Sequence, residues 1–266
     1  MPKIFFITPP LSFEKRYGSL AGAGSSAPSL GILMLAAVAR NQGHDCSVVD
    51  ASALALTEQE LLQRLAAVQP DLLCISSTTL AIGNASSFAV AARAILPAIT
   101  IVVGGPHVTA APRATMESFP IFDIAVVGEG EVILAELLEA LEAGHTLASV
   151  SGLFYRDGVS LRDTGRHSFI ADLDSLPFPA WELLEGFPQC YLPAPFKVRK
   201  LPAATLVTSR GCPNTCIFCD RSVFGSSCHA FSAEYVVRQM TELYQRYGIR
   251  EFSFEDDTFI TFKSRL

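Results

Sequence analysis

Short runs of hydrophobic residues alternate with longer amphipathic stretches along the first half of the chain. An apolar run bounded by polar residues is typical of a strand that is buried on both faces. In the stretches between the runs, hydrophobic residues recur about every three or four positions, which predicts helices. The predicted strands are Lys3–Thr8, Asp45–Asp50, Leu72–Ser76, Thr100–Val103 and Ile124–Val127. The predicted helices are Leu30–Gln42, Thr57–Val68, Ile82–Leu96, Pro112–Ser118 and Glu131–Ala143.

This alternation predicts an α/β fold built on a parallel sheet. A helix between successive strands returns the chain to the starting end of the sheet, so the strands run in one direction. Five strands in this order fit a doubly wound, flavodoxin-like domain with helices on both faces. We assign residues 1–148 to this domain. Thr57 and Glu60 supply a capping box at the start of its second helix.

The pattern changes in residues 149–202. Ser151–Leu161 reads as a hairpin, because Asp157-Gly158 is a favoured two-residue turn between strands. After the hairpin, periodicity is lost and prolines recur. Apolar residues such as Phe178 and Trp181 nevertheless require burial, so we expect an ordered interdomain segment that lies across the first domain.

Residues 203–266 predict a strand, a helix and a second strand. The strands are Ala203–Ser209 and Arg250–Glu255, and the helix is Ser232–Tyr247 with Gly248 just beyond its end. Such a unit fits the first part of a parallel β/α barrel or sheet. Chemistry in these folds lies at the carboxyl ends of the strands.

Composition limits the classes of function. Hydrophobic residues make up 50% of the 266 residues, enough to bury a sizeable core. The net charge is −6 and no long Lys/Arg-rich run is present, so the charge does not favour a nucleic-acid partner. The longest apolar stretch, Ile32–Ala39, is too short to cross a bilayer, and no signal-peptide pattern opens the chain. We expect a cytoplasmic protein whose cysteines are thiols or metal ligands.

Small and polar residues follow four of the predicted strands. Because the carboxyl ends of parallel strands meet at one edge of a doubly wound sheet, such residues are expected to surround a ligand. Glycines there let a ligand approach the backbone, although any one of them alone also serves to turn a strand into a helix. The residues are Pro9, Pro10, Ser76, Thr78, Gly104, Gly105, His107, Gly128, Glu129 and Gly130.

Another glycine pattern, Gly22-Ala-Gly24, matches part of a dinucleotide-binding fingerprint. That fingerprint has to follow the first strand directly and open a helix. Here a long stretch intervenes and Pro28 interrupts the pattern, so the sequence disfavours a nicotinamide or flavin cofactor.

Three cysteines near the C-terminus carry the most specific chemistry. Cys212, Cys216 and Cys219 follow the spacing C-x3-C-x2-C. Three thiolates on one loop suit a four-iron cluster with one iron left open for a substrate or cosubstrate. Spacing alone leaves two alternatives, a zinc site completed by Cys228 or His229 and a set of free thiols.

The cysteine spacing, with Phe218 before the last cysteine, resembles the cluster loop of radical S-adenosylmethionine (SAM) enzymes. Thr208-Ser-Arg-Gly-Cys-Pro213 and Phe254-Glu-Asp-Asp-Thr-Phe259 resemble the subgroup with an N-terminal cobalamin-binding domain. The segment Leu173-Asp-Ser-Leu-Pro-Phe-Pro179 is similar to the interdomain segment of that subgroup.

Two loops resemble those of the subgroup's cobalamin domain, Gly104-Gly-Pro-His107 and Val127-Gly-Glu-Gly-Glu131. The resemblance implies that the ten residues after the strands contact cobalamin, which faces the cluster. It also implies that the three cysteines hold a [4Fe–4S] cluster whose open iron binds SAM, with Phe218 near the adenine.

An external electron donor would then drive reductive cleavage of SAM to a 5′-deoxyadenosyl radical, for methyl transfer or rearrangement on an unidentified small molecule.

The chain departs from the subgroup in two ways. It contains no Asp-x-His-x-x-Gly motif, so the resemblance implies no histidine ligand to cobalamin from such a motif. It also ends at Leu266, soon after the second strand of the expected barrel. We therefore expect either a truncated chain or a second chain that completes the barrel, and impaired turnover by this chain alone. The alternatives are a cobalamin carrier with a vestigial cluster segment and a zinc-binding regulatory domain.

Overall fold

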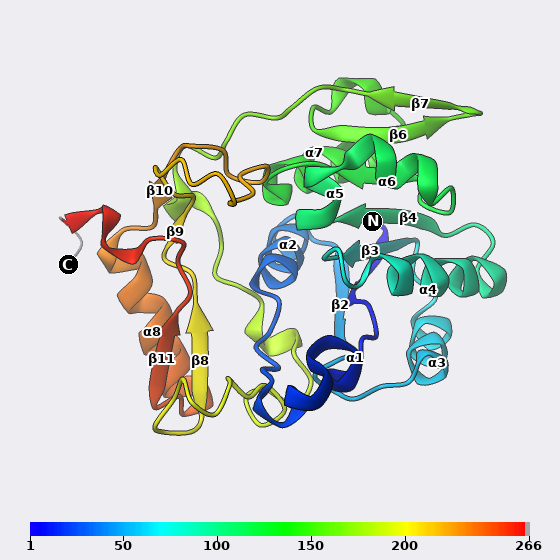
Figure 1. Cartoon of the computed structure of the whole chain (residues 1–266). Helices are drawn as coiled ribbons and strands as arrows, with labels where there is room; N and C mark the ends of the chain where they lie inside the picture. Colours follow the sequence, from blue (N-terminus) through cyan, green and yellow to red (C-terminus); the bar gives the residue numbers. More distant parts are fainter. Residues whose placement is uncertain (264–266) are drawn as a thin grey trace.

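The computed structural model of the chain describes residues 1–263. A large α/β domain is joined to a smaller unit of strands and one long helix near the C-terminus (Figure 1). The last three residues of the predicted segment 203–266 lie outside the described part. Within residues 1–263, none of the helices combines the length and hydrophobicity needed to cross a bilayer.

The large domain is built on a seven-stranded sheet with the order β2-β1-β3-β4-β5-β6-β7. Its first five strands are parallel, and their order is that of doubly wound, flavodoxin-like sheets, as the sequence predicts. These strands are β1 (Lys3–Thr8), β2 (Asp45–Asp50), β3 (Leu72–Ser76), β4 (Thr100–Gly104) and β5 (Ile124–Val126).

Helices cover both faces of this sheet because successive strand residues point to opposite sides. Ile4 and Phe6 of β1 pack with α2 and α7 in one core cluster, whereas Phe5 and Ile7 pack with α3 and α4 in the other. The capping box predicted for Thr57 and Glu60 opens α3. The helices are α2 (Leu30–Asn41), α3 (Glu58–Val68), α4 (Ile82–Ile95), α6 (Pro112–Ser118) and α7 (Gly130–Ala143).

The predicted hairpin consists of β6 (Leu153–Asp157) and β7 (Ser160–Asp163), with Gly158 at positive φ in the turn. β6 pairs antiparallel with β5, so the hairpin extends the sheet of the large domain. The chain enters it from α7 through a short 3-10 turn, η2 (Leu147–Ser149).

Among the short helical segments that the sequence does not predict, three lie within the large domain before β5. They are α1 (Phe13–Tyr17), the 3-10 helix η1 (Gly18–Ala23) and α5 (Pro106–Ala110). The Gly22-Ala-Gly24 pattern lies at the end of η1. It is not at a strand-to-helix turn, where a dinucleotide-binding fingerprint has to lie.

The proline-rich segment is ordered by aromatic packing. It includes the 3-10 turns η3 (Leu173–Ser175) and η4 (Trp181–Leu183). Trp181 and Tyr191 are almost fully buried, and the Trp181 ring lies 5.0 Å from that of Phe187 between their centroids. This burial explains why a stretch without periodicity still has a defined path.

The smaller unit contains β8 (Ala203–Leu206), α8 (Ala233–Tyr247) and β11 (Glu251–Phe254), with β8 and β11 parallel. Ser232 caps the start of α8 and Gly248 ends it in the left-handed conformation. A short turn, η5 (Phe259–Thr261), follows β11.

The predicted strand Ala203–Ser209 is wrong in extent, because β8 ends at Leu206. Ser209 and Arg210 form a separate short strand, β9, which pairs antiparallel with β10 (His229–Ala230). The break places Arg210 over the edge of the large sheet, where it meets the loop after β5.

Candidate functional site

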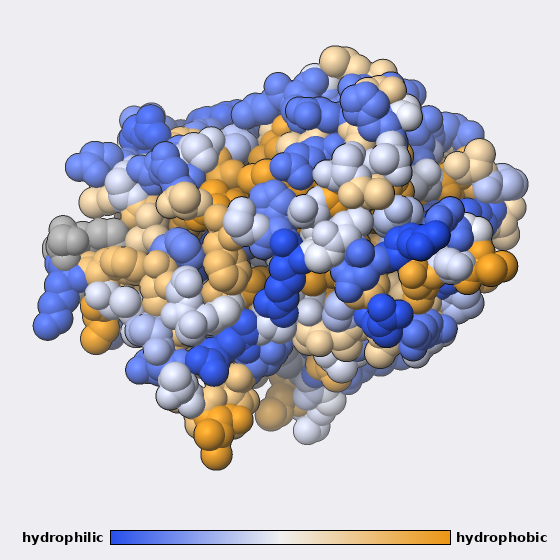
Figure 2. Space-filling view, turned by 90° about the horizontal axis from the view of Figure 1, so that it is seen from above, coloured by the Kyte–Doolittle hydropathy of each residue, from blue (hydrophilic) through white to orange (hydrophobic). Residues whose placement is uncertain are grey.

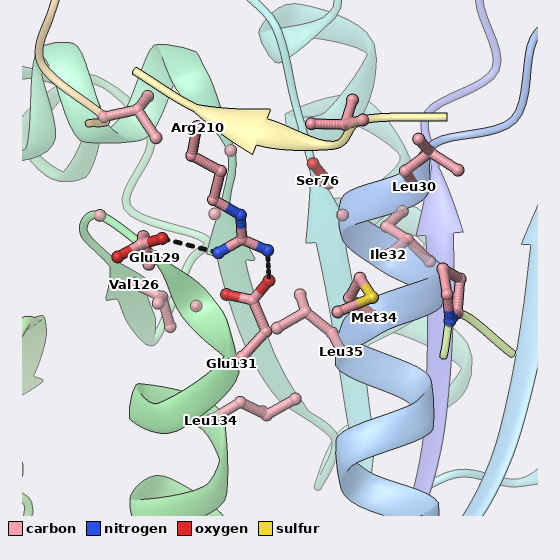
Figure 3. Close-up of a pocket in the computed structure, with 18 of the residues that line it drawn as sticks. Leu30, Ile32, Met34, Leu35, Ser76, Val126, Glu129, Glu131, Leu134 and Arg210 are labelled. Atoms are coloured by element: carbon pink, nitrogen blue, oxygen red, sulfur yellow. Dashed lines mark hydrogen bonds and ion pairs between the residues drawn. The ribbon is translucent and has the colours of Figure 1, made fainter. Parts of the chain in front are cut away.

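A cavity of about 260 Å³ lies between the edge of the large sheet and the segment that carries the cysteines. Ser76 at the end of β3 and Gly104, its partner at the end of β4, form part of its floor. The first turns of α2 form one wall, beside Ser76 (Figure 3). The opposite side comes from the smaller unit. Its lining residues there are Val207, Arg210, Val223, Phe224, Phe231, Tyr235 and Gln239.

The cavity collects part of the set that the sequence predicts for cobalamin. Of the ten residues, those that line it are Ser76, Gly104, Gly105, Gly128, Glu129 and Gly130. Those outside the lining are Pro9, Pro10, Thr78 and His107. His107 hydrogen-bonds through Nδ1 to Thr79 Oγ1 at 3.1 Å, and the carbonyl of Pro10 accepts a hydrogen bond from Asn84. Contact of these four residues with a cofactor stays a prediction.

Two glycines of the lining have left-handed backbone conformations for different reasons. Gly105 has φ +98°, and a Cβ there would lie 2.8 Å from both the backbone N and the backbone O of Ser77. Gly128 has φ +103°, and a Cβ there would meet nothing within 4 Å. Gly105 is therefore required by close backbone packing, whereas Gly128 borders open space into which a ligand can reach.

The polar end of the cavity is a buried ionic cluster of Arg210, Glu129 and Glu131. Arg210 Nη1 donates to Glu129 Oε1 at 2.7 Å, and Nη2 donates to Glu131 Oε1 at 2.5 Å (Figure 3). The side chain of Arg210 is 9% exposed, and those of the two glutamates are 3% and 6% exposed. Glu129 also accepts the backbone N–H of Ile170 at 2.9 Å through its other oxygen.

Two carboxylates against one guanidinium leave an excess negative charge, which the start of α7 stabilises. Glu129 is the N-cap residue and Glu131 lies in the first turn, where free backbone N–H groups favour anions. Burial acts to lower the pKa of Arg210, but Glu131 and Glu129 outweigh it, so the pKa is raised above its usual value. Removing one partner from such a buried pair typically costs about 3–5 kcal/mol.

Sequence reasoning did not assign a role to Arg210 or Glu131. Arg210 belongs to the motif that leads into the cysteines, and its partners lie 79 and 81 residues away in the chain. The available signal was a charged residue next to an apolar strand, which demands a buried counter-ion.

The three cysteines lie on one surface loop but do not converge. Cys216 and Cys219 are exposed, Cys212 is partly buried, and Phe218 is 88% exposed. Within residues 1–263, no group of three or more His, Cys, Asp or Glu side chains is arranged to hold a metal. Both the cluster and the zinc alternative therefore stay predictions.

The surroundings of Cys212 favour a thiolate, the form that ligates metals. Its Sγ lies 3.2 Å from Thr258 Oγ1 and accepts a hydrogen bond from Asn214 Nδ2 at 3.3 Å. The hydrogen bond with Thr258 is the main cause of a pKa below the usual value for this thiol. The donor chemistry thus fits a metal-bound thiolate at the first cysteine, and it does not distinguish a cluster from a zinc site.

Asp256 ties the cysteine segment to β11. Its carboxylate accepts hydrogen bonds from the Thr208 N–H at 2.6 Å, from the Thr208 hydroxyl at 2.5 Å and from the Ser209 hydroxyl at 2.7 Å. The acidic residues after the second predicted strand therefore include one that holds the start of the cysteine loop in place.

We expect Asp256→Ala to lower the free energy of unfolding by about 2 kcal/mol, because the donors on Thr208 and Ser209 lose this carboxylate as their acceptor. Asp257→Ala is the matched control, because Asp257 is exposed and should change stability by less than about 0.5 kcal/mol. Urea unfolding measures both variants. Equal stabilities of the two variants would contradict this role of Asp256.

Comparisons with known proteins agree with this geometry. The B12 binding domain family matches residues 19–138, which include the cavity residues of β3, β4 and α7. An uncharacterized methyltransferase of Pyrococcus horikoshii is 35% identical over 99% of this chain and 55% of its own length. The cobalamin-dependent radical SAM methyltransferase TokK of Streptomyces tokunonensis is 30% identical over 58% of this chain and 22% of its own length.

The chain belongs to the radical SAM proteins that carry a B12-binding domain.

Solved structures show the same fold for this radical SAM protein. The cobalamin-dependent SAM radical enzyme OxsB, with aqua-cobalamin and SAM bound, superposes with a TM-score of 0.75. The match has 21% sequence identity and covers 98% of this chain and 34% of OxsB. The radical SAM chain spans about half the length of the P. horikoshii relative and less of the other two proteins.

Proposed function

We propose that this radical SAM chain binds a B12 cofactor at the cavity and a [4Fe–4S] cluster at Cys212, Cys216 and Cys219. One observation carries the proposal: residues of the B12-binding domain and residues beside the cysteines line the same cavity. A site shared in this way is expected where two cofactors act on one substrate.

The cavity fits part of a B12 molecule. Its walls are mostly hydrophobic, and Gly31 and Gly128 border open space, so a flat ligand can approach the backbone. A volume of about 260 Å³ is far less than a whole B12 molecule needs, so the cavity would take one portion while the rest extends from its mouth. Arg210 and Gln239 offer polar groups for the amides of such a cofactor.

The cluster would be held by the exposed cysteine loop. We assign the ligands to the three thiolates and an adenine contact to Phe218, with Asn214 and Thr258 favouring the thiolate at Cys212. A bound cluster would supply the electron for reductive cleavage of SAM, and the B12 cofactor would carry the group to be transferred. The chain's own residues bind and orient these groups.

We propose radical methyl transfer as the reaction in which the chain takes part, because TokK and the P. horikoshii relative are both methyltransferases by name. We also propose that β8, α8 and β11 are the first part of a β/α barrel, because they form a parallel strand–helix–strand unit. Residues 1–148, 149–202 and 203–266 would then be the B12 domain, the interdomain segment and the start of the barrel. The remaining strands would come from further sequence or from a second chain, without which we expect impaired turnover.

Anaerobic reconstitution of the chain tests this function. With iron, sulfide and hydroxocobalamin, we expect about four irons and one cobalt per chain, with a broad absorption band near 400 nm. Elemental analysis distinguishes the alternatives, since cobalt without iron supports a B12 carrier and stoichiometric zinc supports a regulatory domain. A chain that retains neither cobalt nor iron would contradict the proposal.

A further inference from the structure

We propose that the cluster of Arg210, Glu129 and Glu131 couples binding at the B12 site to assembly of the metal site at the cysteines. The inference rests on the proposed function for the identity of the two ligands. Its physical basis is a rigid path, formed by residues of this chain, from the floor of the cavity to Cys212.

The path begins in the loop after β5. Glu129 and Glu131 flank Gly130, and all three residues line the cavity. A ligand that contacts Gly128 or Gly130 therefore fixes the backbone that carries both carboxylates. Because these carboxylates are buried and bonded to Arg210, their positions and that of the guanidinium cannot change independently.

The path continues from Arg210 through the backbone to the first cysteine. Arg210 lies in β9, which is paired with β10. Gly211 has φ +83°, and a Cβ there would lie 2.0 Å from the carbonyl oxygen of Ser227. This tight packing leaves little room for rotation between Arg210 and Cys212, so movement of the guanidinium is passed to the sulfur ligand.

A contact between the Arg210 guanidinium and the ring of Phe224 forms a second connection to the cysteine segment. The guanidinium carbon lies 5.9 Å from the centre of the Phe224 ring, which also lines the cavity. Phe224 lies in the chain between Cys219 and β10, so both ends of the cysteine loop are held near Arg210. Ordering of the loop by a metal would thus favour one position of the guanidinium and its two carboxylates.

Coupling of this kind is reciprocal, because a ligand that favours one arrangement of a shared element favours the other ligand by the same factor. We expect the reconstituted chain to bind hydroxocobalamin about tenfold more tightly than the chain without iron and sulfide, a typical size for such coupling. Removing the shared ionic contact should bring the two dissociation constants together.

The experiment measures the Kd of hydroxocobalamin anaerobically, before and after reconstitution, for the whole chain and its variants. Glu131→Gln and Arg210→Lys should reduce the ratio of the two Kd values to about one. Glu242→Gln is the matched control, because Glu242 pairs with Arg246 on the exposed side of α8, and it should retain the ratio. A loss of stability alone would shift both Kd values together and leave their ratio unchanged.

The outcomes separate this inference from the proposed function. One outcome is that the wild-type chain binds both cofactors with the same Kd for hydroxocobalamin before and after reconstitution. That result overturns the coupling and leaves the proposed function intact. Retention of the full ratio in Glu131→Gln or Arg210→Lys overturns the role of the ionic cluster. A chain that binds neither cofactor overturns both proposals. The wild-type ratio is measured even where a variant does not fold.

Discussion

Replacing Cys212, Cys216 and Cys219 together by alanine is expected to abolish iron binding by the reconstituted chain. Three thiolates supply the protein ligands of the proposed cluster, and alanine offers no replacement. Iron content should fall from about four per chain to near zero, and the absorption near 400 nm should disappear with it. Because Cys216 and Cys219 are exposed, the fold should survive and hydroxocobalamin should still bind.

Two single variants serve as controls. Cys190→Ala changes an exposed cysteine outside the loop and should retain all iron. Cys228→Ala separates the two metal hypotheses, because it leaves a three-thiolate cluster complete but removes a possible ligand of a zinc site. Unchanged iron content in the triple variant would show that the metal is held elsewhere.

Gly105→Ala is expected to lower the free energy of unfolding by about 3 kcal/mol or more. Gly105 has φ +98° and ψ −178°, a region that only glycine adopts readily. The added methyl group would also lie 2.8 Å from the backbone N and O of Ser77. These atoms already bond to the Gly104 carbonyl and the His107 N–H, so relief of the clash would break contacts between β3 and β4 at the cavity floor.

Two other glycines of the cavity lining separate the backbone strain at Gly105 from the clash with Ser77. Gly128→Ala has a similar φ of +103° but no atom within 4 Å of the new methyl group, so it measures the backbone strain without the clash. At Gly104 the nearest atoms to a new methyl group lie 3.8 Å away, in ordinary contact, and we expect a small change in stability. Denaturant unfolding compares the three variants, and equal losses would contradict the packing argument.

The sheet could be predicted from the sequence because its signals are local. Each of the first five strands is a short apolar run, and each intervening helix has its own periodicity, so the parallel order followed from general rules of chain connection. Two helix boundaries could also be predicted, because specific residues mark them. Thr57 and Glu60 form the capping box at the start of α3, and Gly248 ends α8.

The site was less predictable because its contacts are distant in the chain. β9 and β10 contain two residues each, too few to show any periodicity. The residues of α2 that line the cavity, such as Ile32 and Met34, are hydrophobic. Nothing in the sequence distinguishes them from other hydrophobic residues of the core. The motif spacing identified the cysteines, but their sulfur atoms do not converge among the described residues.

In the view from above, hydrophilic and hydrophobic residues are interspersed over the surface (Figure 2). The net charge of −6 does not by itself favour a nucleic-acid partner. The proposed function depends on the composite cavity between the B12-binding domain and the cysteine segment.

Hydrogen exchange measured by mass spectrometry tests that cavity most directly. On addition of hydroxocobalamin to the anaerobically reconstituted chain, we predict slower exchange at the loops 76–79, 104–107 and 128–131. We predict slower exchange also at 207–211 and 223–235, which cover the cavity from the cysteine side. Protection confined to residues 1–202, or no protection at either set of segments, would contradict a shared site.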